Sequence, residues 1–387
     1  MAALWDAPPA AVARDGRRCH AWAHVRWSPD GRHLLAVDAA SDARLYAVDE
    51  NGNARGAGEG DADSSSDADS DAAAAPPPLD PFLCVPLGQA VRSVSWYPGG
   101  AAFAACSRDH PLQLVDALTG RVRATYACKD CWDAPADLTA VAFAPDGKAL
   151  LVGDDRGGLR VVDAANPGST AVVHHLPPPR RKRARRGDDD LGTDHTVARG
   201  QISCVACAPP HAWAAGERLC LVGSCGGSVG AYDLRADLRA APAMRMDGHH
   251  GGVTSIEFGK DGANYAITAA RRDARLLCWD LRSTRGAVLE MARDGGASNL
   301  RLGLDVDPVA GRHVVSGRCD GGVSVFDLQA SGAEVERHAV CGGVAAGVTG
   351  VALHPWLPLL ATAAGARPDG AGPGARDAVA LWRVARA

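Results

Sequence analysis

The sequence predicts an all-β chain folded into a closed, seven-bladed WD-repeat β-propeller, and two repeating patterns carry this prediction. An apolar run that ends in an aspartate recurs along the 387 residues, and strand-like runs followed by turns such as Pro-Asp-Gly recur in step with it. Four short strands in about 40–47 residues, closed by Trp-Asp, are typical of one propeller blade. Helical periodicity is absent, which favours strands throughout.

The first pattern gives the number of blades. The apolar runs end at Asp49, Asp116, Asp163, Asp233, Asp280, Asp327 and, in the last unit, Arg383. Their spacings are 67, 47, 70, 47, 47 and 56 residues, so three agree and each longer one contains an insert. Seven units therefore predict seven blades. In the first unit either Tyr46 or Val48 takes the place of the tryptophan.

The second pattern gives the order of elements within a blade. WSPDG (27–31) and FAPDG (143–147) each follow an alternating run, and Pro-Asp-Gly is β-turn chemistry. Each unit therefore reads as three strands joined by turns, with a fourth short strand such as FLCVPL (82–87). The last unit has only three strands before Ala387, so we expect the N-terminal segment around Ala2 to Trp5 to supply the fourth and close the ring.

Several polar residues are expected to hold the blades together and to do no chemistry. An aspartate six residues before the tryptophan position should be buried in the turn between the second and third strands, as in the pair Asp273 and Trp279. There it would accept hydrogen bonds from the turn and from a histidine in the preceding loop, His249 or His250. The predicted structural residues are Asp109, His249, Asp273, Trp279, Asp280 and Asp320.

Composition excludes several classes of function. Apolar residues make up 47%, which indicates a globular chain, and no apolar run approaches the roughly 18 residues of a membrane helix. The start of the chain lacks the features of a signal peptide. The pairs Cys128/Cys131 and Cys204/Cys207 lack a second pair of ligands, so we expect no metal and no cofactor. No phosphate-binding loop or nucleophile motif indicates an enzyme.

Two inserts interrupt a single domain that spans residues 1–387. Residues 50–80 carry eight acidic residues and one arginine, which leaves the rest of the chain at −4 + 7 = +3. Residues 177–198 contain a basic tract. Both inserts should be disordered, because neither can form a core. The tract resembles a nuclear import signal and could also contact a polyanion; its basic residues are Arg180, Arg181, Lys182, Arg183, Arg185 and Arg186.

Arginines recur in the turns between second and third strands, for example Arg271-Arg272 in ARRDARLLCWDLR (270–282). These turns open on the same face of a propeller as the connections between blades. Charge for solubility explains each arginine alone, but recurrence on one face favours an anion-binding surface. Trp132, between the second and third blades, is placed to stack on a base. The predicted RNA-binding residues are Arg108, His110, Trp132, Arg156, Arg271, Arg272 and Arg318.

Three stretches go further than the repeat. SRDHPLQLVDALTG (107–120), LLCWDLR (276–282) and LHPWLPLLATAAG (353–365) resemble the telomerase Cajal body protein family, over about residues 20–384. The resemblance implies a nuclear RNA-binding scaffold, located in the Cajal body or nucleoplasm. It would recognise the CAB-box loop of H/ACA small Cajal body RNAs and, as a second candidate, telomerase RNA, and would direct these particles to nuclear bodies.

The resemblance also implies partners. It implies folding by the cytosolic chaperonin and possible association with the telomerase ribonucleoprotein, and we expect a monomer that does not bind membranes. The chain lacks the long terminal extensions of the animal proteins, so a role with modification-guide RNAs is better supported than one in telomerase. The alternative is a protein-interaction adaptor in a nuclear chromatin or ubiquitin-ligase complex, whose arginines would grip an acidic or phosphorylated motif.

Overall fold

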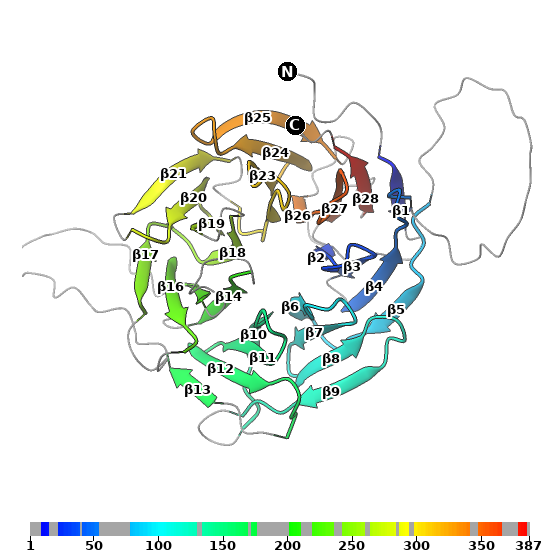
Figure 1. The fold of residues 1–387 in the computed structure, drawn as a ribbon, viewed down its shortest axis with the longest axis vertical. Coiled ribbons are helices and arrows are strands. Elements are labelled where there is room, and N and C mark those ends of the chain that lie inside the picture. The colour runs from blue at the N-terminus through cyan, green and yellow to red at the C-terminus, as the bar shows by residue number, and fades with distance from the viewer. Residues whose placement is uncertain are drawn as a thin grey trace, which may run out of the picture.

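The apolar runs of the repeat lie in the third strands of seven four-stranded antiparallel sheets, which stand radially around a common centre (Figure 1). This arrangement confirms the predicted seven-bladed propeller. The computed structural model describes residues 9–14, 22–38, 41–53, 78–129, 134–168, 172–175, 201–209, 219–235, 242–259, 264–283, 286–293, 298–340, 347–365 and 378–384. Within these ranges no helix has the length and apolarity needed to cross a membrane. The basic tract and most of the acidic insert lie outside them.

In each blade the first strand lies nearest the centre and the fourth lies outermost (Figure 1). Blade 1 consists of β2 (Trp22–Trp27), β3 (His33–Asp38), β4 (Asp42–Ala47) and β5 (Leu83–Pro86), and blade 2 consists of β6 (Val91–Trp96), β7 (Ala102–Ser107), β8 (Leu112–Asp116) and β9 (Val122–Tyr126). Blade 3 consists of β10 (Leu138–Phe143), β11 (Ala149–Asp154), β12 (Gly158–Asp163) and β13 (Val172–His175). Blade 4 consists of β14 (Ile202–Cys207), β15 (Leu219–Ser224), β16 (Ser228–Asp233) and β17 (Met244–Asp247).

Blades 5 to 7 repeat this order, except that the last one draws its outer strand from the beginning of the chain. Blade 5 consists of β18 (Val253–Phe258), β19 (Tyr265–Ala270), β20 (Arg275–Asp280) and β21 (Ala287–Ala292). Blade 6 consists of β22 (Leu304–Val306), β23 (His313–Gly317), β24 (Gly322–Asp327) and β25 (Ala333–Ala339). Blade 7 consists of β26 (Gly347–Leu353), β27 (Leu359–Gly365), β28 (Ala378–Arg383) and β1 (Ala11–Arg14).

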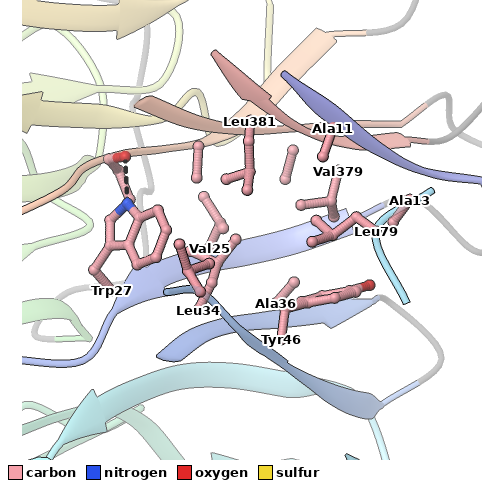
Figure 2. Close-up of a cluster of buried hydrophobic side chains, with 14 of the residues drawn as sticks. Ala11, Ala13, Val25, Trp27, Leu34, Ala36, Tyr46, Leu79, Val379 and Leu381 are labelled. Carbon is pink, nitrogen blue, oxygen red and sulfur yellow. Dashed lines mark hydrogen bonds between the residues drawn. The ribbon is translucent and has the colours of Figure 1, made fainter. Parts of the chain in front are cut away.

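The N-terminal segment closes the ring, as the strand count predicted, but with different residues. Strand β1 pairs with β28, with Ala11 opposite Leu381 and Ala13 opposite Val379, so the placement of this strand around Ala2 to Trp5 is wrong. Ala11 and Ala13 are 2% and 7% exposed and pack into the cluster between blades 7 and 1 (Figure 2). There Trp27 donates from Nε1 to the carbonyl oxygen of Ala352 at 3.0 Å.

The aspartate that closes each apolar run has the same local task in six blades. Its carboxylate accepts the backbone N–H two residues further on, at 2.8–2.9 Å, and so fixes the turn that leaves the third strand. These aspartates are Asp49, Asp116, Asp163, Asp233, Asp280 and Asp327. The most regular marker of the repeat is thus a turn-forming residue, which agrees with the structural role predicted for Asp280.

Blade 5 contains the buried hydrogen-bond network expected of its sequence. Trp279 Nε1 lies 2.8 Å from Thr268 Oγ1, His249 Nε2 lies 2.7 Å from the same oxygen, and His249 Nδ1 lies 2.9 Å from Asp273 Oδ2. Burial lowers the pKa of His249, so the ring is neutral. All three contacts are satisfied when His249 donates from Nδ1 to Asp273 and accepts at Nε2 from the Thr268 hydroxyl. His250 contributes only its backbone N–H, which reaches Asp273 at 3.0 Å.

The position of the blade 5 tryptophan is taken by a tyrosine in blade 1 and by a tryptophan in blade 7. Tyr46, not Val48, takes it in blade 1, where Tyr46 lies opposite Leu34 and is fully buried. In blade 7, Trp382 donates from Nε1 to Thr362 Oγ1 at 2.8 Å and so repeats the bond made by the blade 5 tryptophan.

The prediction that Asp109 and Asp320 are buried acceptors is wrong. The Asp109 side chain is 67% exposed and its backbone is left-handed, with φ of 55°. The turn of blade 2 is one residue shorter than that of blade 5, so counting back six residues from Val115 reaches the exposed tip instead of the buried acceptor position. The Asp320 side chain is 56% exposed and only accepts the N–H of Gly322 and the guanidinium of Arg318.

Blades 1 and 3 place their buried carboxylate at the end of the second strand, a pattern that sequence reasoning missed. Asp154 Oδ1 accepts the backbone N–H of Arg156 at 3.0 Å, while its Oδ2 pairs with the buried guanidinium of Arg160. Asp38 is likewise buried and lies 3.6 Å from Arg44. In both blades the arginine follows the aspartate by six residues. This spacing is the sequence signal for an ion pair inside a blade.

Candidate nucleic-acid interface

The turns between second and third strands share one face of the ring with the connections between blades. In four blades the turn donates to the connecting loop: Arg108 N to Ala90 O, Asp155 N to Asp137 O, Cys225 N to Gln201 O and Arg271 N to Gly252 O. We call this the arginine face, and the opposite side, where first and third strands end, the back face. The predicted residues Arg108, His110, Arg156, Arg271 and Arg272 all lie in turns of the arginine face.

Arg271 and Arg272 form a pair of adjacent cations on the arginine face. Both are exposed, and among the described residues neither guanidinium has a hydrogen-bond or ion-pair partner. Their backbone is nonetheless fixed, because Arg271 N donates to Gly252 O at 2.9 Å and Arg272 N donates to Ser298 O at 3.0 Å. Arg272 has a left-handed φ of 52°, which turns consecutive side chains outward at the tip.

A buried arginine supports this turn from below. Arg293 is 5% exposed and donates from its NH2 group to Ala270 O at 2.7 Å. Burial lowers the pKa of Arg293 to about 10, so the group stays positive at neutral pH. Its Nε and NH1 have no hydrogen-bond partner among the described residues. Blade 5 therefore places a third positive charge beneath Arg271 and Arg272.

The mouth of the central channel is crossed by Arg301, which sequence reasoning missed. Six first strands carry a β-bulge near their start, and the extra residue leaves a carbonyl outside the ladder. Arg301 donates to two such carbonyls on opposite sides of the ring, to Thr254 O at 2.7 and 3.1 Å and to Arg92 O at 3.0 Å. His24 Nε2 also reaches Arg92 O, at 3.0 Å.

The channel below this crossing is lined by ionisable side chains. Arg26 of blade 1 pairs across it with Glu257 of blade 5 at 2.6 Å. Burial, together with Arg301 and Arg26, lowers the pKa of His24 to about 3, so this ring is neutral. Burial and the neighbouring Glu257 raise the pKa of Asp305 to about 7. The cavity at this level measures about 40 Å³, which is too small for a nucleic-acid strand.

The other predicted RNA-binding residues do not form one exposed cluster with Arg271 and Arg272. Arg108 and His110 lie in blade 2 and Arg156 in blade 3, away from the blade 5 pair; Arg108 is exposed and lies 3.8 Å from Asp109. Arg318 sits one position earlier in its turn than Arg271 does, at the end of the second strand, where it is 8% exposed and paired with Asp320. Arg318 thus lies in the predicted turn but is buried there, unlike Arg271 and Arg272. Trp132 lies outside the described residues.

The described cysteines of the two predicted pairs do not come together as metal ligands would. Cys204 and Cys207 pack into different hydrophobic clusters, and Cys131 lies outside the described residues. Across the part of the chain that the structure describes, no three His, Cys, Asp or Glu side chains are grouped closely enough to hold a metal ion.

Gly251 positions the arginine turn, and its replacement tests that coupling. A Cβ at Gly251 would lie 1.9 Å from the carbonyl oxygen of Arg271, so Gly251→Ala must displace the turn. We expect a loss of about 1–3 kcal/mol in the free energy of unfolding, as for other overpacked sites. Urea unfolding measures it, with Gly168→Ala as control because a Cβ there would meet only Asn166 Oδ1, at an ordinary contact distance of 3.8 Å. Equal stability of the two variants would contradict the assigned contact.

Comparison with known proteins agrees with this geometry. The family described as WD domain, G-beta repeat matches residues 241–280, which include most of blade 5. The closed ring of seven blades and this match define a WD-repeat β-propeller, a class whose members generally act as non-catalytic scaffolds.

Within that class the predicted resemblance to the telomerase Cajal body protein family is confirmed. Telomerase Cajal body protein 1 of Bos taurus is 31% identical over 360 residues and that of Homo sapiens 31% over 354 residues, each across 88% of this chain. The Drosophila melanogaster homolog is 26% identical over 383 residues, across 92% of the chain. The chain matches 57%, 56% and 60% of the length of these relatives.

Proposed function

We propose that this protein is a non-catalytic RNA-binding scaffold that holds the CAB-box loop of an H/ACA small Cajal body RNA on its arginine face and directs the particle to a nuclear body. The observation that carries the proposal is the pair Arg271 and Arg272, exposed and free of partners among the described residues, on a turn fixed from both sides. The names of the homologues, which refer to telomerase and the Cajal body, support the RNA class and a nuclear location.

The chemistry of the pair suits a single-stranded loop. Splayed bases stack on guanidinium planes, and phosphates accept their N–H groups. A turn whose backbone is already fixed loses little entropy on binding, so more of the contact energy appears as affinity. Because ionisable side chains line the channel, the loop would lie across the mouth, with Arg271 and Arg272 on one side and Arg108 with His110 on the other.

Direct binding to RNA tests the proposal. A labelled H/ACA hairpin with its CAB-box loop is titrated with the protein, beside the same hairpin with a permuted loop and an acidic phosphopeptide of similar charge. We expect the first to bind at least tenfold more tightly than either of the others. Equal affinity for both hairpins would contradict loop recognition. Tighter binding of the phosphopeptide would favour the alternative, an adaptor that grips an acidic motif.

The proposed partners differ in their support. Homologues carry telomerase in their names, and the chain matches just over half of their length. We propose modification-guide RNAs as the first partner and telomerase RNA as the second. Assistance by the cytosolic chaperonin fits the topology, because β1 must wait for β28, more than 360 residues later, before the ring closes. We propose a monomer, since this pairing completes the ring within one chain.

The basic tract is proposed to act as a nuclear import signal. Replacing Arg180, Arg181, Lys182 and Arg183 by alanine should shift a fluorescent fusion from nucleus to cytoplasm, because import receptors read clustered positive charge. Replacing Asp188, Asp189 and Asp190 by alanine in the same segment is the control and should leave the fusion nuclear. A tract variant that stays nuclear would contradict this role.

A further inference from the structure

The back face carries a large cavity that the proposed RNA site does not use. It measures about 940 Å³ and lies between blades 7 and 1, where the turns after β2, β4 and β26 meet. Ligand pockets commonly measure about 300–1,000 Å³, so this one has room for several side chains of a partner. Its lining includes Asp30, Arg32, Asp49, Glu50 and Trp356.

An exposed but fixed tryptophan forms one side of this back-face cavity. Trp356 is 53% exposed, while His354 beneath it is fully buried. His354 Nδ1 accepts the backbone N–H of Trp356 at 3.2 Å and that of Leu357 at 2.9 Å, and its Nε2 donates to Gly31 O at 2.9 Å. The two rings meet edge to face, with centroids 5.1 Å apart. A buried histidine thus ties blade 7 to blade 1 and presents an indole to solvent.

The lining of the back-face cavity is mainly acidic. It has three carboxylates, on Asp30, Asp49 and Glu50, against the single guanidinium of Arg32, because burial lowers the pKa of His33 and leaves that ring neutral. Glu50 is exposed and has no ion-pair or hydrogen-bond partner among the described residues.

The sequence that follows Asn53 is also acidic. The turn that begins at Asp49 ends at Asn53, and residues 54–77 then carry six carboxylates and one arginine. A fixed aromatic ring beside acidic groups matches a guanidinium, which stacks on the ring and donates hydrogen bonds to carboxylates at its edge. The ammonium of lysine lacks this planar stacking, so the pairing favours arginine over lysine.

We propose that the back-face cavity binds an arginine-rich segment of a partner protein, with one guanidinium stacked on Trp356 and paired with Glu50. The scaffold would then hold RNA on the arginine face and a basic protein on the back face at the same time. This site uses no residue of the RNA interface and stands independently of it.

Peptide binding to the full chain tests the proposal. Fluorescein-labelled nona-arginine and nona-lysine peptides are titrated by fluorescence anisotropy. Nona-arginine should bind wild type more tightly than nona-lysine does. Trp356→Ala should weaken nona-arginine binding at least tenfold and remove the preference, and Glu50→Gln should weaken it severalfold. Leu118→Ala, which removes another exposed apolar side chain from a back-face turn, should leave binding unchanged. Arg271→Glu/Arg272→Glu should also bind nona-arginine normally, which separates this site from the RNA interface.

Three results would overturn the proposal. One is equal binding of nona-arginine by Trp356→Ala and wild type. Another is binding that survives Trp356→Ala but disappears when the six carboxylates of residues 54–77 are replaced by amides, because the acidic segment alone would then hold the peptide. The third is a wild-type dimer in sedimentation that Trp356→Ala dissociates, because the cavity would then be covered by a second copy of the chain.

Discussion

Arg271→Glu/Arg272→Glu should lower the affinity for the CAB-box hairpin at least 100-fold. Each guanidinium that contacts a phosphate on single-stranded RNA contributes about 0.7 to the slope of log affinity against log salt, so two lost contacts should reduce the slope by about 1.4. A lost stacking partner costs on the order of 1–3 kcal/mol more. Because both side chains are exposed, the melting temperature should not change.

A control variant distinguishes local contact from general charge. Arg245→Glu/Arg337→Glu makes the same change in net charge on the outer strands β17 and β25, where both arginines are exposed. This variant should lose only a few-fold in affinity, through weaker long-range attraction, and should keep the salt slope of wild type. Equal losses in the two double variants would mean that the pair at the blade 5 turn makes no special contact.

Asp273→Ala should destabilise the propeller by about 3 kcal/mol, because it removes the acceptor for a set of buried donors. Asp273 accepts from His249 Nδ1 at 2.9 Å, His250 N at 3.0 Å and Arg275 N at 3.1 Å, and it is 3% exposed. Without it the His249 ring keeps a buried, unpaired N–H. Urea unfolding at pH 7 measures the loss. Asp109→Asn is the control and should cost nothing measurable, since that carboxylate is exposed and asparagine, like aspartate, tolerates the left-handed backbone at this position.

The Asp273 carboxylate also makes the free energy of unfolding depend on pH. Burial alone would raise the pKa of Asp273, but hydrogen bonds from His250, His249 and Arg275 outweigh it and lower the pKa to about 2, from an ordinary value of 3.8. A carboxyl group whose pKa is depressed on folding contributes stability above its unfolded pKa and loses it as the pH falls through the folded one. Wild type should therefore lose this contribution between about pH 4 and pH 2. An unchanged acid profile in Asp273→Ala would contradict the assignment.

The repeat predicts the propeller because its marker is local. An aspartate that accepts the N–H two residues further on needs no distant partner, so the spacing of Asp116, Asp163 and Asp280 reports the blades directly. The buried network of blade 5 follows from sequence for a similar reason, since His249, Asp273 and Trp279 lie within one repeat unit.

The errors arise where one residue of turn length or a distant contact decides the outcome. Asp109 is exposed and Arg318 is buried, contrary to expectation, because their turns differ in length and register from the turn of blade 5. The spacing to the third strand does not reveal this difference. Arg301 reaches Arg92, 209 positions away, through a carbonyl freed by a bulge, and nothing near Arg301 in the sequence indicates this. The closing strand was misplaced because its position is decided by pairing with β28, more than 360 residues away, which the strand count does not reveal.

Photocrosslinking tests most directly the central claim that RNA lies across the channel mouth on the arginine face. A CAB-box hairpin with 4-thiouridine in its loop is irradiated with the 387-residue protein, and the crosslinked peptides are identified by mass spectrometry. We expect crosslinks in the turn that carries Arg271 and Arg272 and in the facing turn that carries Arg108 and His110. Crosslinks confined to the back face, around Asp30 and Trp356, or to the outer strands would contradict it.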